Sequence, residues 1–238
     1  SLSTVDLKVQ DDLTVTDDVS VGGDLATTGA STAASYNGIT SKTFGTSSIM
    51  IGDNATGTID AANYNTGVGV DVFAALTTGD NNVVIGFGAG DALTSGGQNV
   101  AIGYLALSTE DAHGSNVAIG RQALENQNAG AEAYNVAIGS LAGNDITTGT
   151  FNTLIGGLAG DSLTDADYNI GVGYAALGAD TLGSRSTAVG HNALAQQNFT
   201  TATDAYNTAV GMLAGYNVTT GTFNTLIGGL SGDALTVG

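Results

Sequence analysis

Short runs of alternating residues recur along this chain, and each run ends in glycine. The pattern is a polar residue, an apolar residue, a small residue, Ile or Val, and then Gly, as in Asn116-Val117-Ala118-Ile119-Gly120. It occurs eleven times, from residues 48–52 to residues 224–228. Val117 and Ile119 would lie on one face of a strand and Ala118 on the other. Each run is therefore predicted to form a short β-strand.

The runs recur at an almost constant interval. Their final glycines are 17 residues apart in eight of the ten intervals and 19 and 21 residues apart in the other two. A unit this short cannot bury its own apolar face, so the units must stack and share a core. We predict an all-β fold, a parallel β-roll or β-helix solenoid. The large residues on one strand face and the small residue on the other indicate burial on both faces, one inside the coil and one against a sister chain.

Three zones divide the chain. Residues 1–29 carry a six-residue repeat, with Leu7, Leu13, Val19 and Leu25 six apart, and are predicted to form a β shaft. Residues 30–47 keep neither period and are predicted to be a transition or linker. Residues 48–238 hold the array with the 17-residue period.

Two positions of the unit have predicted structural roles. The opening residue is Asn in nine units, and these amides are expected to hydrogen-bond along the axis as a ladder: Asn65, Asn82, Asn99, Asn116, Asn135, Asn152, Asn169, Asn207 and Asn224. Ser48 and Ser186 take their place in the other two units. The final glycines are expected at coil corners that require left-handed backbone or very close packing: Gly52, Gly69, Gly86, Gly103, Gly120, Gly139, Gly156, Gly173, Gly190, Gly211 and Gly228.

Six aromatic residues directly precede the opening polar residue of a unit. They are Tyr64, Tyr134, Phe151, Tyr168, Tyr206 and Phe223. They could form an exposed platform for a sugar, but residues at one repeat position are more often a cap on the edge of the core, which is the interpretation favoured here.

The two longer units come from a duplicated block of four. From Asn82 the unit lengths are 17, 17, 19 and 17, and from Asn152 they are 17, 17, 21 and 17. The insertions, residues 126–134 and 196–206, are predicted to project from the same side, four coils apart. They are either tolerated surface insertions or loops that contact a partner through Gln127, Asn128, Glu132, Tyr134, Gln197, Asn198, Phe199, Asp204 and Tyr206.

The composition restricts the classes of function. A net charge of −18 argues against nucleic acid as a partner, and no apolar run is long enough for membrane insertion. The absence of Cys excludes disulfides and thiolate chemistry. With 37 Gly and no Pro, the chain can form tight corners, and every residue keeps an N–H donor for a parallel ladder.

Few residues are candidates for chemistry. His113 and His191 occupy different repeat positions and are expected to be solvated, so no metal site, cofactor or catalytic residue is predicted, and the chain is not expected to be an enzyme. Asp91, Asp161 and Asp233 are interpreted as turn residues, with an adventitious Ca²⁺ ligand as the alternative. Most other acids are expected in turns, with no pair singled out for glycan cleavage: Glu110, Asp111, Glu125, Glu132, Asp165 and Asp167.

The N-x-A-[I/V]-G pattern, followed by x-x-A-[L/G], resembles the repeats of phage tail-fibre and head-fibre proteins and the head repeats of YadA-like trimeric autotransporter adhesins. Residues 13–25 are similar to shaft segments of phage fibres, which favours the viral interpretation. The resemblance implies a homotrimeric fibre segment of a virion, located on the particle or outside the cell. Its partners would be other virion proteins and a host surface glycan or protein. A bacterial adhesin head and a glycan depolymerase tailspike are the alternatives.

Overall fold

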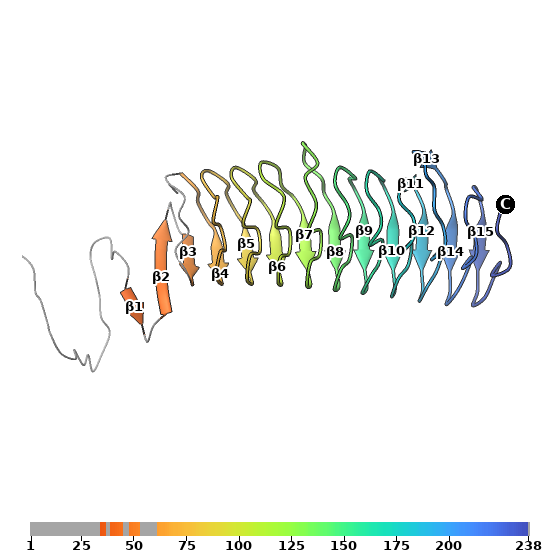
Figure 1. The fold of residues 1–238 in the computed structure, drawn as a ribbon, viewed down its shortest axis with the longest axis horizontal. Helices are drawn as coiled ribbons and strands as arrows, with labels where there is room; N and C mark the ends of the chain where they lie inside the picture. The colour runs from red at the N-terminus through yellow and green to blue at the C-terminus, as the bar shows by residue number, and fades with distance from the viewer. Residues whose placement is uncertain (1–33, 37–38, 45–47, 53–60, 238) are drawn as a thin grey trace, which may run out of the picture. The chain divides into compact units, whose positions relative to one another are not determined.

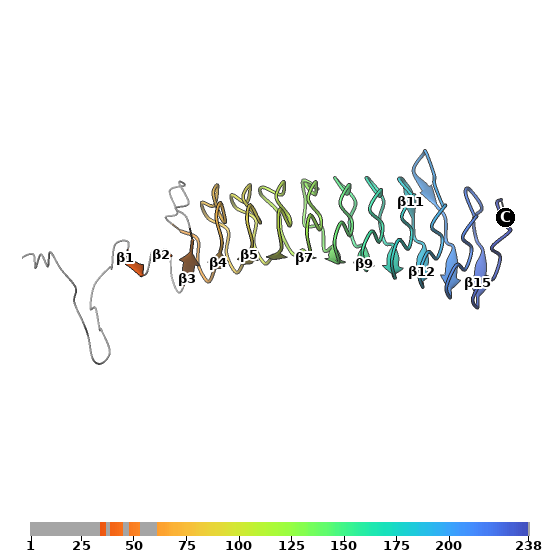
Figure 2. The same cartoon turned by 60° about the horizontal axis from the view of Figure 1, so that its bottom comes forward.

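The computed structural model describes residues 34–36, 39–44, 48–52 and 61–237, and the predicted shaft lies outside these ranges. The described residues form strands and turns without helices, so the prediction of an all-β solenoid is confirmed. No helix capable of crossing a membrane occurs in this described part. Figures 1 and 2 show successive coils stacked along one axis, each contributing one strand to a common sheet.

The main sheet follows the order of the chain except where β11 and β13 form a small sheet of their own. The main strands are β1 (Ala34–Tyr36), β2 (Ile39–Phe44), β3 (Ser48–Ile51), β4 (Thr66–Val68), β5 (Val83–Ile85), β6 (Val100–Ile102), β7 (Val117–Ile119), β8 (Val136–Ile138), β9 (Thr153–Ile155), β10 (Ile170–Val172), β12 (Thr187–Val189), β14 (Thr208–Val210) and β15 (Thr225–Ile227). Strand β11 (Gly183–Ser184) pairs in parallel with β13 (Thr203–Asp204), which belongs to the second insertion.

The strands pair in register by repeat position. Val100 pairs with Val117 and Ala101 with Ala118, and the same offset of one unit holds from β3 to β15. The strands β1 and β2 lie in the segment predicted to be a linker. They run antiparallel, and β2 pairs with β3, so the first parallel strand has a partner on its N-terminal side. That pairing satisfies an edge that would otherwise expose unpaired N–H and C=O groups.

In the parallel strands of the main sheet from β4 to β15, the middle residue faces the coil interior. Ala101, Ala118 and Ala188 are fully buried, whereas the first and third residues of their strands are partly exposed. This is the alternation that the sequence predicts. The small residue therefore belongs to the chain's own core, and the large β-branched residues form the outer face of the sheet.

Residue size is balanced across the thin core. Four residues after its corner glycine, the coil of Ala101 carries the buried Leu107, whereas the coil of Leu154 carries Gly160 at the same position. A Cβ on Gly160 would lie 2.8 Å from Cδ2 of Leu154, and a Cβ on Gly67 would lie 2.8 Å from the Phe73 ring. In these coils one of the two positions is large and the other is small. In the coils of Ala137 and Ala209 both positions are small, and leucines of the adjacent coils fill the space, since a Cβ on Gly143 would lie 3.0 Å from Leu124 and from Leu154.

The glycines that end the strands stack directly on one another. Their φ values lie between 118° and 146°, a region that side chains rarely adopt. A Cβ on Gly103 would overlap the carbonyl oxygen of Gly120 in the next coil. Comparable overlaps occur from Gly52 to Gly211, so the coil spacing itself excludes a side chain here.

Many other residues adopt left-handed backbone. The residue before the ladder position has a φ between 50° and 63° in every coil from Tyr64 to Phe223, although none of these residues is glycine. This conformation costs roughly 1–2 kcal/mol per residue. Backbone hydrogen bonds between adjacent coils stabilise this conformation. For example, the N–H of Gln98 donates to the carbonyl of Asp80, and the N–H of Tyr168 donates to the carbonyl of Thr150.

The asparagines form a mostly buried ladder in which seven of the nine amides make two kinds of bond. The Oδ1 of Asn152 accepts the N–H of Asn169 in the next coil at 2.9 Å, and its Nδ2 donates to the carbonyl of Ala166 across its own coil at 2.7 Å. The same pair of bonds recurs at Asn65, Asn82, Asn99, Asn135, Asn169 and Asn207. Ser48 substitutes at the first coil, where its Oγ accepts the N–H of Asn65 at 3.0 Å. One side chain per coil thus joins two coils and two sides of one coil.

Asn152→Ala should destabilise the solenoid by about 2–4 kcal/mol, because it leaves the buried N–H of Asn169 and the carbonyl of Ala166 without these partners. Urea unfolding followed by circular dichroism measures this change. Asn224→Ala is the matched control, since the Asn224 side chain is only part-buried and bonds only to Asn207. Equal losses for the two variants would contradict a ladder that stabilises by joining coils.

Candidate interaction surfaces and a buried polar site

The outer face of the main sheet is apolar along its whole length. From β3 to β15, 22 positions flank the inward-facing middle residues of the strands; 17 of them are Ile or Val, five are Thr and none is charged. The most exposed apolar members are Ile49, Val68, Val83, Ile85, Ile155, Ile170, Val210 and Ile227, each at least 36% exposed. Continuous apolar surface of this kind commonly marks an interaction site.

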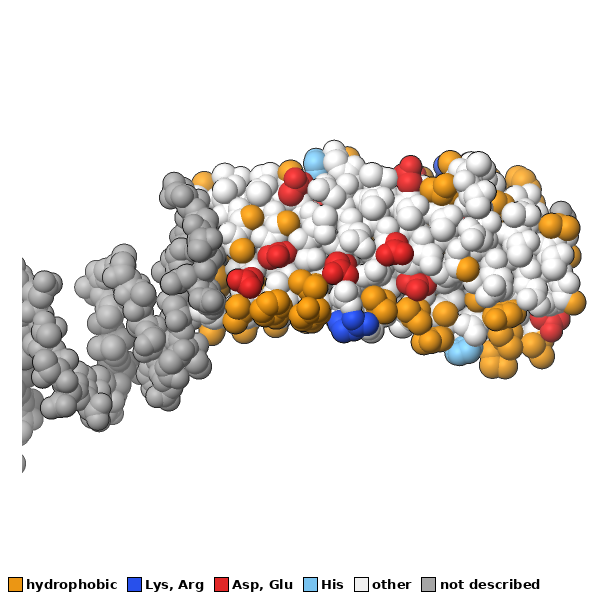
Figure 3. Space-filling model, in the orientation of Figure 1, with side chains coloured by type: hydrophobic (Ala, Val, Ile, Leu, Met, Phe, Trp, Pro, Cys, Tyr) orange, Lys and Arg blue, Asp and Glu red, His pale blue; other side chains and the backbone are white. Residues whose placement is uncertain are grey.

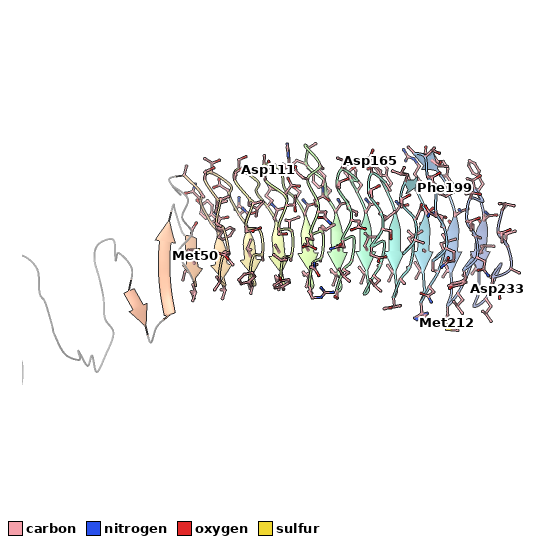
Figure 4. The ribbon with its side chains drawn as sticks, viewed as in Figure 1. Met50, Asp111, Asp165, Phe199, Met212 and Asp233 are labelled. Carbon is pink, nitrogen blue, oxygen red and sulfur yellow. The ribbon has the colours of Figure 1, made fainter. Side chains whose placement is uncertain are left out.

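A second apolar row adjoins this face. It consists of five of the ten described residues that directly follow a corner glycine, namely Val70, Phe87, Tyr104, Tyr174 and Met212, all exposed. The other five coils have Arg121, Ser140, Gly157, His191 and Gly229 at this position. Phe87 stacks on Tyr104 with ring centroids 5.7 Å apart. Figure 3 shows hydrophobic side chains gathered along this edge, where Figure 4 places Met212.

The aromatic residues that precede the ladder asparagines stack on one another at the surface. Tyr134, Phe151 and Tyr168 stack with centroids 5.4 and 5.1 Å apart, and Tyr206 stacks on Phe223 at 5.3 Å. Arg185 fills the gap between Tyr168 and Tyr206, with its guanidinium 4.7 and 5.9 Å from their ring centroids. The prediction that these rings cap the core was wrong, because all six are 44–74% exposed and five of them stack on another ring of the row. Phe151, Tyr168 and Tyr206 each have two stacking neighbours, either rings or the Arg185 guanidinium, so these three rings lack the free faces of a sugar platform.

The insertions project from one edge of the stack, the upper edge in Figure 1. Asn128, Glu132, Tyr134, Asn198, Asp204 and Tyr206 are exposed there. The second insertion is tied to the preceding coil by an ion pair of 3.0 Å between Arg185 Nε and Asp204 Oδ1. The prediction of partner contact was wrong for Gln127, Gln197 and Phe199, since these side chains are buried.

The two buried glutamines belong to a column of core residues. Seven residues after each corner glycine the chain places Leu76, Leu93, Ile146, Leu163 and Val218, all fully buried. In each half of the duplication this column contains an acid followed by a glutamine: Glu110 with Gln127, and Asp180 with Gln197. The expectation that Glu110 lies in a turn was wrong, because the repeat places it in the core, outside the turns.

The carboxylate of Asp180 is fully satisfied. Its Oδ1 accepts the N–H groups of Gly183 and Phe199, each at 3.1 Å, and its Oδ2 accepts Nε2 of Gln197. The Oε1 of Gln197 in turn accepts Nδ2 of Asn207, which joins the pair to the ladder. Burial raises the pKa of Asp180 despite these donors, which favour the charged form.

The carboxylate of Glu110 has a different environment. Its Oε1 accepts the N–H of His113 at 3.1 Å, whereas its Oε2 is buried without a hydrogen bond. The Nδ1 of His113 is also buried without a hydrogen bond and lies 3.8 Å from Glu110 Oε1. Burial raises the pKa of Glu110, and the His113 N–H acts in the opposite direction. His113 was expected to be solvated like His191, but its side chain is only 31% exposed.

The first insertion changes the ladder beside this carboxylate. The Nδ2 of Asn116 is buried without a hydrogen-bond partner. In other coils the Nδ2 of the ladder asparagine donates to the carbonyl of the residue 14 positions later in the chain. The lengthened unit displaces that carbonyl. Gln127 connects the insertion to the ladder instead, since its Oε1 accepts Nδ2 of Asn135 at 2.6 Å.

The aspartates interpreted as turn residues lie in turns, and two of them are partly desolvated. Asp91, Asp161 and Asp233 all occupy turns. Burial raises the pKa of Asp91 and of Asp161, and the acids Asp71 and Asp145 add to the effect at each site. The structure brings no third ligand to either aspartate among the described residues.

Comparison with known proteins identifies no relative. No protein-family model matches the chain, and neither a curated protein nor a solved structure matches it. Inferences about function therefore depend on the surfaces and sites described above.

The wild-type protein should gain stability relative to Asp180→Asn as the pH falls from 7 towards 4. The folded-state pKa of Asp180 is raised above its ordinary value of 3.8. At pH values between 3.8 and the raised pKa, the folded state therefore binds more protons than the unfolded state, so the free energy of unfolding increases as the pH falls. Urea unfolding of both proteins across this pH range measures the difference. Glu132→Gln, at an exposed position, is the control. A difference between wild type and Asp180→Asn that stays constant with pH would refute the assignment.

Proposed function

We propose that this chain is a structural and attachment protein, the trimeric fibre segment of a phage-like virion, which extends toward the host surface and contacts it. The observation that carries the proposal is the uncharged outer sheet face, with Ile or Val at 17 of its 22 positions. The protein has 11% charged residues and a net charge of −18, yet it places none of those charges on this face. Such segregation supports a face that a sister chain covers.

The geometry of the stack supports parallel, in-register association. The apolar positions recur once per coil on the same side, so a second copy can match them along the full array. Burial of apolar surface contributes roughly 25 cal/mol per Å², and short repeated contacts add up over successive strands. The adjoining row of Phe87, Tyr104, Tyr174 and Met212 would enlarge the contact.

A rigid scaffold of this kind suits attachment through its projecting loops. The exposed residues of the two insertions lie on the loop edge, away from the edge that carries Met212 (Figures 1 and 4). In a trimer each loop would occur three times, which raises avidity without new contacts. Binding of labelled protein to a panel of bacterial cells, compared with a variant in which Asn128, Glu132, Asn198 and Asp204 are Ala, tests this part. Release of reducing ends from capsule would instead favour the depolymerase.

Val117→Glu should dissociate the assembly. The native mass of the wild-type protein by light scattering is expected at three times the chain mass of 23.4 kDa, and that of the variant at or near one chain mass. The reason is that the introduced carboxylate would be buried at each of the three contacts, at a cost of several kcal/mol apiece. Thr220→Glu, at an exposed turn position, is the control that should remain assembled. A monomeric wild-type protein would overturn the proposal.

A further inference from the structure

We infer that Glu110, Asp111 and His113 form a binding site for one divalent transition-metal ion of the Zn²⁺ class. One ligand atom from each of the three side chains can be chosen so that all lie within 4.8 Å of one another. The site lies at the edge from which the insertions project, where Figure 4 shows Asp111. This inference is independent of the proposed attachment function.

Two unsatisfied atoms point to a ligand rather than to a solvated acidic cluster. Glu110 is fully buried and its Oε2 has no hydrogen bond, while Nδ1 of His113 is buried with none either. A buried carboxylate oxygen and a buried ring nitrogen without partners are costly. A cation between them would satisfy both, because each offers a lone pair.

The distances suit such an ion. Glu110 Oε1 and His113 Nδ1 are 3.8 Å apart. Two ligands bound tetrahedrally to Zn²⁺ at about 2.0–2.2 Å are separated by about 3.3–3.6 Å, so the two side chains would need to approach each other by only a few tenths of an ångström. Asp111, the most exposed of the three, would close onto the ion from the solvent side.

The chemistry of the donors selects the class of metal. Two carboxylates and a neutral imidazole carry a charge of −2, which a divalent cation neutralises. The imidazole favours Zn²⁺, Co²⁺ or Ni²⁺ over Ca²⁺ and Mg²⁺, which prefer oxygen ligands. Three protein ligands leave at least one coordination position open to water or to a ligand from a partner.

The duplicated block provides an internal comparison. The residues 70 positions later are Asp180, Thr181 and Gly183, so the second copy retains the buried acid and lacks both other ligands. There the carboxylate is satisfied by Gln197, Gly183 and Phe199. A Cβ at Gly183 would overlap Oδ2 of Asp180, which excludes a histidine in that copy. The stoichiometry should therefore be one ion per chain and not two.

The test uses chelator-treated whole protein and Co²⁺ as a spectroscopic probe, with Zn²⁺ content measured after dialysis. We expect one Co²⁺ per chain with visible ligand-field absorption, displaced by Zn²⁺ and not by Ca²⁺. His113→Gly and Asp111→Thr introduce the residues of the second copy, and each should weaken binding at least tenfold. His191→Ala removes the other histidine, which stacks on Tyr174, and should bind as the wild type does.

Three outcomes would overturn the inference. The first is an absence of stoichiometric Co²⁺ or Zn²⁺ binding. The second is binding that persists unchanged in His113→Gly. The third is competition by Ca²⁺ at equal concentration, which would indicate exposed carboxylates only. Circular dichroism and native mass of each variant separate loss of the ligand from loss of the fold, and Asp111→Thr alters an exposed position that the core does not need.

Discussion

Every coil of this solenoid depends on another coil to satisfy its buried polar groups. The ladder asparagines make this dependence explicit, since Oδ1 of Asn152 accepts from the next coil while its Nδ2 holds the opposite side of its own coil. An amide can do both because it offers an acceptor and a donor at once. Ser186 accepts a bond from Gln197 instead, and Gln197 also accepts a bond from Asn207. The buried side chains of Ser186, Gln197 and Asn207 therefore remain paired although the residue type has changed.

The same constraint explains the unusual backbone. The corner glycines approach one another too closely for a Cβ, and Tyr, Phe, Gln and Arg residues adopt left-handed φ values that these residue types disfavour. No local preference selects that conformation. The hydrogen bonds to the adjacent coil compensate for it, so a single isolated unit would lose both the bonds and the backbone geometry. Cooperativity between neighbouring units follows directly.

The period and the strand alternation were sufficient to predict the all-β solenoid and to place Ala118 on the strand face opposite Val117 and Ile119, because residues one period apart must superpose in a regular stack. Which of the two faces points into the coil was not predicted, and the burial of Ala118 shows it. The burial of Glu110 was also accessible from the sequence, since counting from the corner glycine aligns it with Leu76, Leu93 and Ile146. The stacking of Tyr134, Phe151 and Tyr168 was not, since it requires the corner geometry that turns these side chains outward. The position of His113 beside Glu110 likewise depends on a turn that the repeat pattern does not describe.

The duplicated halves show how a repeat can change its chemistry without changing its fold. Asp180 and Glu110 occupy equivalent positions in the two halves. The two sites differ by one methylene group in the acid and by Gly183 in place of His113. The carboxylate of Asp180 is fully hydrogen-bonded, whereas that of Glu110 is not. Because each coil contacts only its neighbours, such a change is compensated within one or two coils and the remaining strands keep their register. The insertions are also accommodated locally. Each lengthens one unit beside a buried acid and glutamine, and the next corner glycine keeps its place in the stack. Local dependence between coils is therefore what fixes the architecture and also what allows individual positions in it to acquire a binding role.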